Sequence, residues 1–165
     1  MNLDADQILS VAYPEDGELR YGFEHGVVNG ETVMDVLIRE WERGVPLTRE
    51  EEAIAFLLRD ELDRLHELIP LLPDASTLPG GMFPNAGMRF WLYVLLSRAL
   101  VECQSPHQFW SRVDDIHAIF GYAGSMTPLI RMPSDPVPEE DSRANLESYI
   151  LSEAQYYSGR MAAAD

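Results

Sequence analysis

The segment Phe90–Val101 reads FWLYVLLSRALV, interrupted only by Ser97 and Arg98. At 3.6 residues per turn, its apolar side chains point in all directions around a helix axis, which is typical of a helix buried in a core. A helix that crosses a bilayer needs about 20 apolar residues, and this stretch is shorter than that. We therefore predict a buried central helix around which the other helices pack.

The chain has 165 residues and one cysteine, Cys103. This length is typical of a single domain, which we assign to residues 1–165 and which buries about 70% of its surface without a disulfide or metal. A lone cysteine excludes an internal disulfide and is typical of a reducing compartment. Residues 1–6 lack the basic and apolar regions of a signal peptide, so we expect a cytoplasmic protein.

No segment alternates apolar and polar residues with the period of a strand, whereas helix-start and helix-end signals recur along the chain. We therefore predict an all-α fold of about seven unequal helices. The longest is expected over Arg49–Ile69, because Thr48 and Glu51 form a capping box and leucines follow at helical spacing. A Pro/Gly-rich connector is predicted over 71–87, and an acidic linker over 133–141. The other predicted helices cover 4–12, 14–25, 30–43 (with Trp41 on its buried stripe), 106–120, a short turn after Ser125, and 142–158.

Charge restricts the classes of partner. The chain has 28 acidic residues, 12 arginines and no lysine, for a formal charge of −16. Nucleic acids and anionic membranes gain affinity from cationic side chains, so this balance disfavours both. It favours solubility and rapid capture of a basic protein. Residues 1–70 carry 17 of the acids, so we expect the acidic surface there.

A candidate partner-binding surface follows from the predicted helix over Arg49–Ile69. Phe56 falls on the polar side of that helix, framed by the acidic residues Glu52, Asp60, Asp63 and Glu67. An aromatic side chain surrounded by acids is a suitable anchor for a basic partner. The alternative is that Phe56 packs beneath a neighbouring helix.

Glu61 differs from Phe56, because it is a charged residue within the apolar stripe of the same predicted helix. An unpaired carboxylate there would be costly. One hypothesis makes Glu61 a general acid or base with a raised pKa. We favour an ion pair with an arginine of the central segment, Arg89 or Arg98.

Other combinations of reactive residues give weaker evidence for a metal or catalytic site. The pairs Asp63/His66 and Asp114/His117 have the helical spacing of metal ligands, but their expected faces do not converge, so we predict no metal site. Cys103 and His107 lack a third orienting group, and we expect an inert thiol. Phosphate-binding, zinc-protease and hydrolase motifs are absent from the sequence. We therefore assign no cofactor and no catalytic residue.

Four stretches carry a resemblance to a known family: 17–26 (GELRYGFEHG), 89–93 (RFWLY), 115–122 (DIHAIFGY) and 130–133 (IRMP). In this order they resemble a bacterial domain-of-unknown-function family of small acidic helical proteins, over residues 5–135. The resemblance implies an association with immunity proteins of bacterial toxin systems. It implies no active site.

These observations give three functional hypotheses. The first is an acidic, immunity-like protein that inhibits a basic partner such as a nuclease toxin. The second is a homo-oligomeric structural module that associates through an apolar helix face. The third is a small-molecule enzyme or sensor with Glu61 as its ionisable group and a pocket near the connector.

Overall fold

The computed structural model describes residues 2–78, 83–121 and 139–160, and of 139–141 only the backbone. The all-α prediction is confirmed: these residues form eight α-helices and no strand, with one isolated bridge between Thr77 and Asn85. The turn predicted after Ser125 lies outside the described residues. The helices are α1 Ala5–Leu9, α2 Asp16–Glu24, α3 Gly30–Glu42, α4 Arg49–Ala55, α5 Leu65–Leu68, α6 Ala86–Glu102, α7 Pro106–Ile119 and α8 Glu139–Tyr156, with 3-10 turns η1 Arg59–Arg64, η2 Ile69–Leu71 and η4 Ser158–Arg160.

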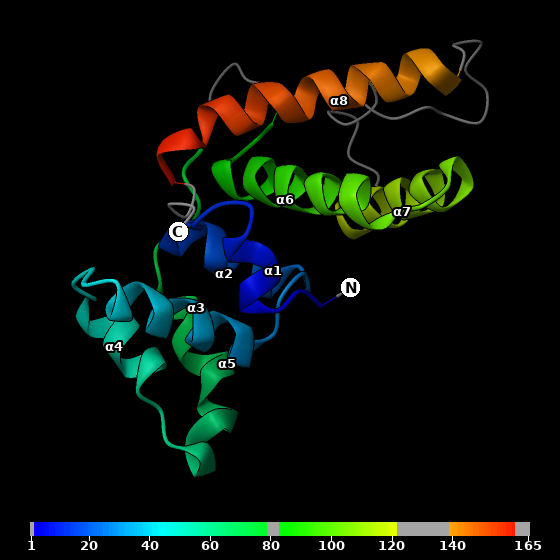
Figure 1. Cartoon of the computed structure of the whole chain (residues 1–165). Coiled ribbons are helices and arrows are strands. Elements are labelled where there is room, and N and C mark those ends of the chain that lie inside the picture. The colour runs from blue at the N-terminus through cyan, green and yellow to red at the C-terminus, as the bar shows by residue number, and fades with distance from the viewer. Residues whose placement is uncertain (1, 79–82, 122–138, 161–165) are drawn as a thin grey trace.

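The helices form two parts joined through α2 (Figure 1). In one part α6 lies against α7 and beneath α8, and it also contacts α2. In the other part, α3, α4 and α5 pack together, and the chain from α4 to α5 makes a projecting tip. We call residues 30–71, from α3 through η2, the acidic half. None of the helices in the described ranges combines the length and the apolar character needed to cross a bilayer.

The central helix is confirmed. α6 contains Phe90–Val101, and its buried side chains face all directions around the axis. Asn85 caps its first turn by accepting a hydrogen bond from the Met88 N–H at 2.8 Å. The buried residues of α6 are Gly87, Met88, Phe90, Trp91, Leu92, Tyr93, Val94, Leu95, Leu96 and Ala99.

Glycines allow α2 and α6 to approach closely. A Cβ atom at Gly22 of α2 would lie 2.4 Å from the Trp91 ring, and one at Gly87 of α6 would lie 2.5 Å from the Tyr21 ring. The Trp91 Nε1–H donates to the Glu18 carbonyl oxygen at 2.6 Å, which orients the indole against α2. Only glycine fits at these two positions, because the facing ring leaves no room for a Cβ atom.

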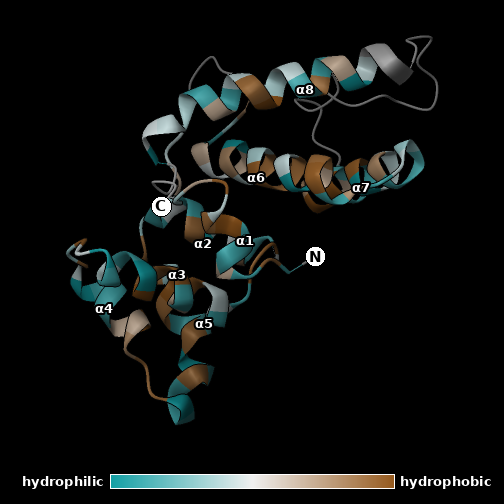
Figure 2. Ribbon diagram, viewed as in Figure 1, coloured by the Kyte–Doolittle hydropathy of each residue, from teal (hydrophilic) through white to brown (hydrophobic). Residues whose placement is uncertain are grey.

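The helix predicted over Arg49–Ile69 is wrong in its length. The capping box of Thr48 and Glu51 begins α4 as expected, but α4 ends at Ala55, with Phe56 as its C-cap. Leu58 is extended (φ −75°, ψ 156°), and η1, α5 and η2 follow as separate short elements. A continuous helix would have placed the Glu61 carboxylate among leucines, a cost that the break avoids. Figure 2 shows the apolar loop between α4 and η1 at the surface.

The last helix begins earlier than predicted. α8 starts at Glu139, inside the stretch assigned to the acidic linker. Its C-terminal end returns to α2 through Arg160, which pairs with the buried Glu18 carboxylate and donates from Nε to the Tyr13 carbonyl oxygen at 2.9 Å. The Tyr13 N–H donates in turn to the Arg160 carbonyl oxygen at 2.7 Å. Arg160 thus joins the two ends of the described chain.

We predict that Gly22→Ala destabilises the protein by about 1–3 kcal/mol, because the added methyl group would overlap the Trp91 ring. At an unhindered helical site a Gly→Ala change stabilises a protein by up to about 1 kcal/mol. A loss of stability in Gly22→Ala would therefore indicate the close contact with Trp91. Urea unfolding followed by circular dichroism measures it. Gly159→Ala is the control, because a Cβ there meets no atom within 4 Å, and it should change stability little. A Gly22→Ala variant as stable as wild type would contradict the contact.

Candidate functional site

Two aromatic side chains lie together at the surface of the acidic half. Trp41 of α3 is 53% exposed and Phe56 is 51% exposed. Their rings meet edge to face, with centroids 5.4 Å apart. Trp41 was expected on the buried stripe of its helix, and that expectation is wrong, since its ring contacts the exposed Phe56 ring instead of entering the core. Val45 and Leu58 nearby in sequence are also exposed.

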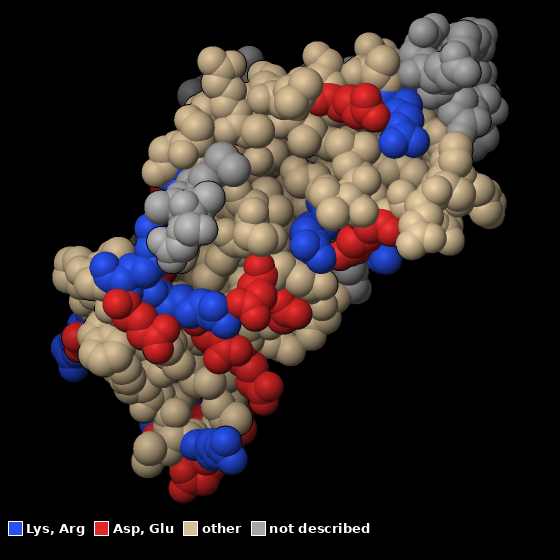
Figure 3. Space-filling model, in the orientation of Figure 1, with Lys and Arg blue, Asp and Glu red and all other residues tan. Residues whose placement is uncertain are grey.

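The four acidic residues predicted around Phe56 are all exposed. They come from three different elements, since Glu52 lies on α4, Asp60 and Asp63 on η1, and Glu67 on α5. With the long helix broken, they do not share one helical face. On the face seen in Figure 3, acidic side chains gather over the acidic half and α2, with arginines among them, while the surface over α6–α8 is mostly uncharged.

Glu61 does not pair with the central helix. It lies on η1 with its side chain 38% exposed, and its carboxylate accepts from Arg64 Nη1 at 2.7 Å. Arg89 pairs instead with Glu153 of α8, and Arg98 pairs with Glu102 within α6. The prediction that Glu61 pairs with Arg89 or Arg98 is therefore wrong, because the break after α4 places Glu61 on η1.

The candidate metal pairs are not brought together. Asp63 and His66 are both exposed on η1 and α5, whereas Asp114 is exposed and His117 is buried. Within residues 2–78, 83–121 and 139–160, no group of three or more His, Cys, Asp or Glu side chains could hold a metal ion.

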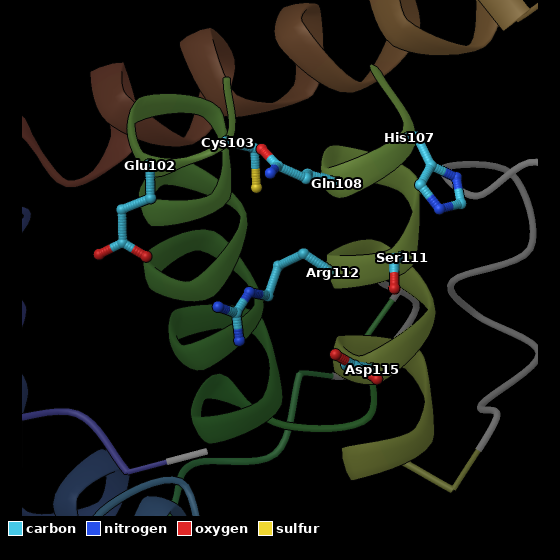
Figure 4. A pocket seen from close by; sticks show the side chains of 7 residues that line it. All are labelled: Glu102, Cys103, His107, Gln108, Ser111, Arg112 and Asp115. Atoms are coloured by element: carbon cyan, nitrogen blue, oxygen red, sulfur yellow. The ribbon is translucent and has the colours of Figure 1, made fainter. Parts of the chain in front are cut away.

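Cys103 and His107 both line a cavity of about 490 Å³ between the end of α6 and the first turns of α7. In Figure 4, the Cys103 thiol lies beside the Gln108 side chain and the His107 ring points away from it. The two residues therefore do not form a nucleophile–base pair. The rest of the lining is polar and consists of Glu102, Gln108, Ser111, Arg112 and Asp115.

A second cavity, of about 400 Å³, lies where α2, α3 and α4 meet residues 73–76. Carboxylates from four segments line it, namely Glu15, Asp16, Glu18, Glu40, Glu51 and Asp74. Asp16 at the start of α2 forms a side-chain hydrogen bond with Glu51 of α4. Sequence reasoning missed this cluster, because its members are far apart in the chain and most are ordinary acids near helix ends.

Burial and mutual repulsion shift the ionisation of this cluster. Desolvation, with the hydrogen bond and charge of Glu51 next in size, raises the pKa of Asp16 to about 7. Desolvation and the charge of Glu51 raise the pKa of Glu40 to about 7 as well. Burial opposes ionisation of Glu51, but hydrogen bonds from Asp16 and Thr48 outweigh it and lower its pKa. The cluster therefore holds protons at pH values where exposed carboxylates have lost them.

A family profile described as "Uncharacterized protein conserved in bacteria (DUF2247)" matches residues 12–154. The chain belongs to the DUF2247 family. The matched region runs from before α2 to near the end of α8, so it includes the last helix, beyond the resemblance over 5–135. The resembling stretches of this DUF2247 chain include the α2–α6 contact, with Gly22 and Trp91. No curated protein and no solved structure matches the chain.

We predict that Asp16→Asn and Glu40→Gln stabilise the DUF2247 chain more at pH 8 than at pH 5. The folded protein keeps both groups protonated up to about pH 7, whereas the unfolded chain ionises them near pH 4. The folded state then binds more protons, so the free energy of unfolding falls as pH rises through this window and stays low above it. Because both groups are partly exposed, solvent screening limits each gain to about 1 kcal/mol at pH 8.

Urea unfolding at the two pH values measures this difference. Asp35→Asn, at an exposed position of α3, is the matched control and should show no pH-dependent gain. Equal effects of Asp16→Asn at both pH values would show that its carboxyl group titrates normally.

Proposed function

We propose that this chain is an acidic protein-binding module that inhibits a basic partner protein, as an immunity protein inhibits a toxin. The binding surface is centred on Trp41 and Phe56, with Glu52, Asp60, Asp63 and Glu67 as the surrounding acidic residues. The observation that carries the proposal is the exposed edge-to-face contact of these two aromatic rings within the acidic half.

Exposed aromatic pairs are suited to protein recognition. Tryptophan is enriched among residues that dominate binding energies, and aromatic residues are enriched in the buried centre of interfaces. Holding the Phe56 ring against the Trp41 ring restricts both before binding, which reduces the entropy lost when a partner covers them. Val45 and Leu58, which are close to Trp41 and Phe56 in sequence, are exposed apolar residues that such an interface could also cover.

The charge of the surface specifies the partner's chemistry. Residues 30–71 carry eleven acidic residues and five arginines. A cationic protein surface is therefore complementary and is attracted over several ångströms of solvent. Nucleases and other nucleic-acid-binding proteins present such surfaces, because they bind phosphates with Lys and Arg. Together with the association with immunity proteins that the family resemblance implies, this chemistry favours a nuclease toxin as the partner.

We predict that Phe56→Ala and Trp41→Ala each weaken binding of the basic partner by about tenfold or more, the effect of removing a central aromatic anchor. Each variant should lose less than about 1.5 kcal/mol of stability, because its ring is half exposed and loses mainly one aromatic contact. The partner is captured on immobilised wild-type protein at low salt and identified by mass spectrometry. Its affinity for each purified variant is then measured by calorimetry.

Leu151→Ala on α8 is the matched control, since Leu151 is an exposed apolar residue outside the acidic half. It should leave affinity unchanged. Binding that survives both aromatic substitutions would refute the surface. A stable oligomer in light scattering that dissociates in Phe56→Ala would instead support the homo-oligomeric alternative.

We also predict that the association rate of the partner falls steeply with ionic strength. The Debye length shrinks from about 8 Å at physiological salt to about 3 Å at 1 M, which removes long-range attraction between exposed charges. Stopped-flow mixing at increasing NaCl measures the rate. Asp60→Asn with Asp63→Asn should flatten the salt dependence while leaving the dissociation rate nearly unchanged. An association rate independent of salt would contradict electrostatic attraction.

A further inference from the structure

One arginine differs from all the others of similar burial. Among the described residues, six arginines are half-buried, and five of these (Arg20, Arg89, Arg98, Arg143 and Arg160) pair with a carboxylate. The sixth, Arg112 of α7, forms no ion pair or hydrogen bond with any described residue. Acidic residues outnumber arginines 28 to 12 in this chain, so the unpaired state of Arg112 needs a structural reason.

The reason lies in the cavity between α6 and α7. Figure 4 shows the Arg112 side chain reaching from α7 across this space toward α6. The nearest acid on α6, Glu102, is engaged by Arg98. Asp115 lies one turn from Arg112 on α7 and also lines the cavity, yet the two form no ion pair. The guanidinium therefore faces the cavity, and no described residue accepts a hydrogen bond from its donors.

Neighbouring groups add further donors. The Gln108 side-chain oxygen accepts from the Gln104 N–H at 3.1 Å, which leaves the amide NH₂ without a described partner. The Ser111 hydroxyl likewise has no described partner and lines the same cavity. The volume of about 490 Å³ is within the range of small-molecule sites, about 300–1,000 Å³.

We propose that this cavity binds a small monocarboxylate that also carries a hydroxyl or amino group. Arg112 holds the carboxylate through its two parallel N–H donors, a geometry that matches the planar carboxylate group. Ser111 and the Gln108 amide donate to the remaining lone pairs of the same two carboxylate oxygens. Asp115 accepts a hydrogen bond from the hydroxyl or amino group of the ligand.

The charge around the cavity selects against more highly charged anions. Glu102 and Asp115 both line it, so a phosphate or dicarboxylate would meet more repulsion than a single carboxylate meets. A neutral amide of the same shape would not satisfy the guanidinium charge. The site thus discriminates by charge as well as by hydrogen bonding.

This site is independent of the surface around Trp41 and Phe56, because its residues come from α6 and α7 rather than from the acidic half. Failure of either proposal therefore leaves the other unaffected.

The test is a titration of the ¹⁵N-labelled full-length protein with L-lactate, propionate, propionamide and inorganic phosphate, followed by NMR of the backbone amides and arginine side chains. We expect saturable shifts of the Arg112 Nε–H and of amides in 103–115, strongest with lactate, weaker with propionate and phosphate, and absent with propionamide. Arg112→Gln should weaken lactate binding by about tenfold or more, equivalent to about 1.4 kcal/mol. Arg59→Gln, which removes an exposed arginine without a described ion pair, should leave it unchanged.

Two further variants separate the roles. Arg112→Lys keeps the charge without the paired donors, so it should bind lactate with intermediate affinity. Asp115→Asn should reduce the preference for lactate over propionate. The proposal is overturned if lactate causes no saturable shifts, if Arg112→Gln or Arg112→Lys binds lactate as wild type does, or if phosphate binds more tightly than lactate.

Discussion

The contact between the Trp91 indole and Gly22 is the constraint on which the rest of this fold depends. The indole lies where a Cβ atom would otherwise stand, and its N–H donates to the Glu18 carbonyl oxygen. Glu18 is itself buried, with 2% of the residue exposed, and Arg160 pairs with its carboxylate, whose burial alone would be costly. Glu18 of α2 therefore contacts both the central helix, through Trp91, and the last described turn, through Arg160.

The two parts of the molecule satisfy their charges differently. Around α6 and α8, half-buried arginines pair with acids across helices or within one, as Arg89 does with Glu153 at 2.7 Å. Where α2, α3 and α4 meet, carboxylates face one another instead, and protonation rather than pairing relieves the repulsion between Asp16 and Glu51. The second solution makes the junction of α2, α3 and α4 sensitive to pH near 7, where Asp16 and Glu40 ionise.

Local signals predicted much of this fold. The uniform apolar composition of Phe90–Val101 identified the buried helix, and α3, α4 and α7 begin at Gly30, Arg49 and Pro106, as predicted. The helix over Arg49–Ile69 failed because leucine periodicity does not reveal a break that tertiary packing imposes at Phe56. Phe56 and its acidic neighbours were selected from the spacing of a helix that the structure breaks, and Trp41, which contacts Phe56, was assigned to the core. The unpaired Arg112 was beyond prediction, since a missing partner is visible only once the helices are placed.

The outward charge of the acidic half follows from how its arginines are used. Arg39 pairs with Asp6 of α1, Arg43 lies over the Tyr13 ring, and Arg64 pairs with Glu61, so three of the five arginines in residues 30–71 are occupied by contacts within the chain. The remaining two, Arg49 and Arg59, are fewer than the exposed acids Glu52, Asp60 and Asp63, which have no described ion pair. Among the described residues, negative charge therefore remains uncompensated in the half that carries the exposed aromatic pair. A cationic partner would neutralise that charge while covering the rings, so both free-energy gains come from the same contact.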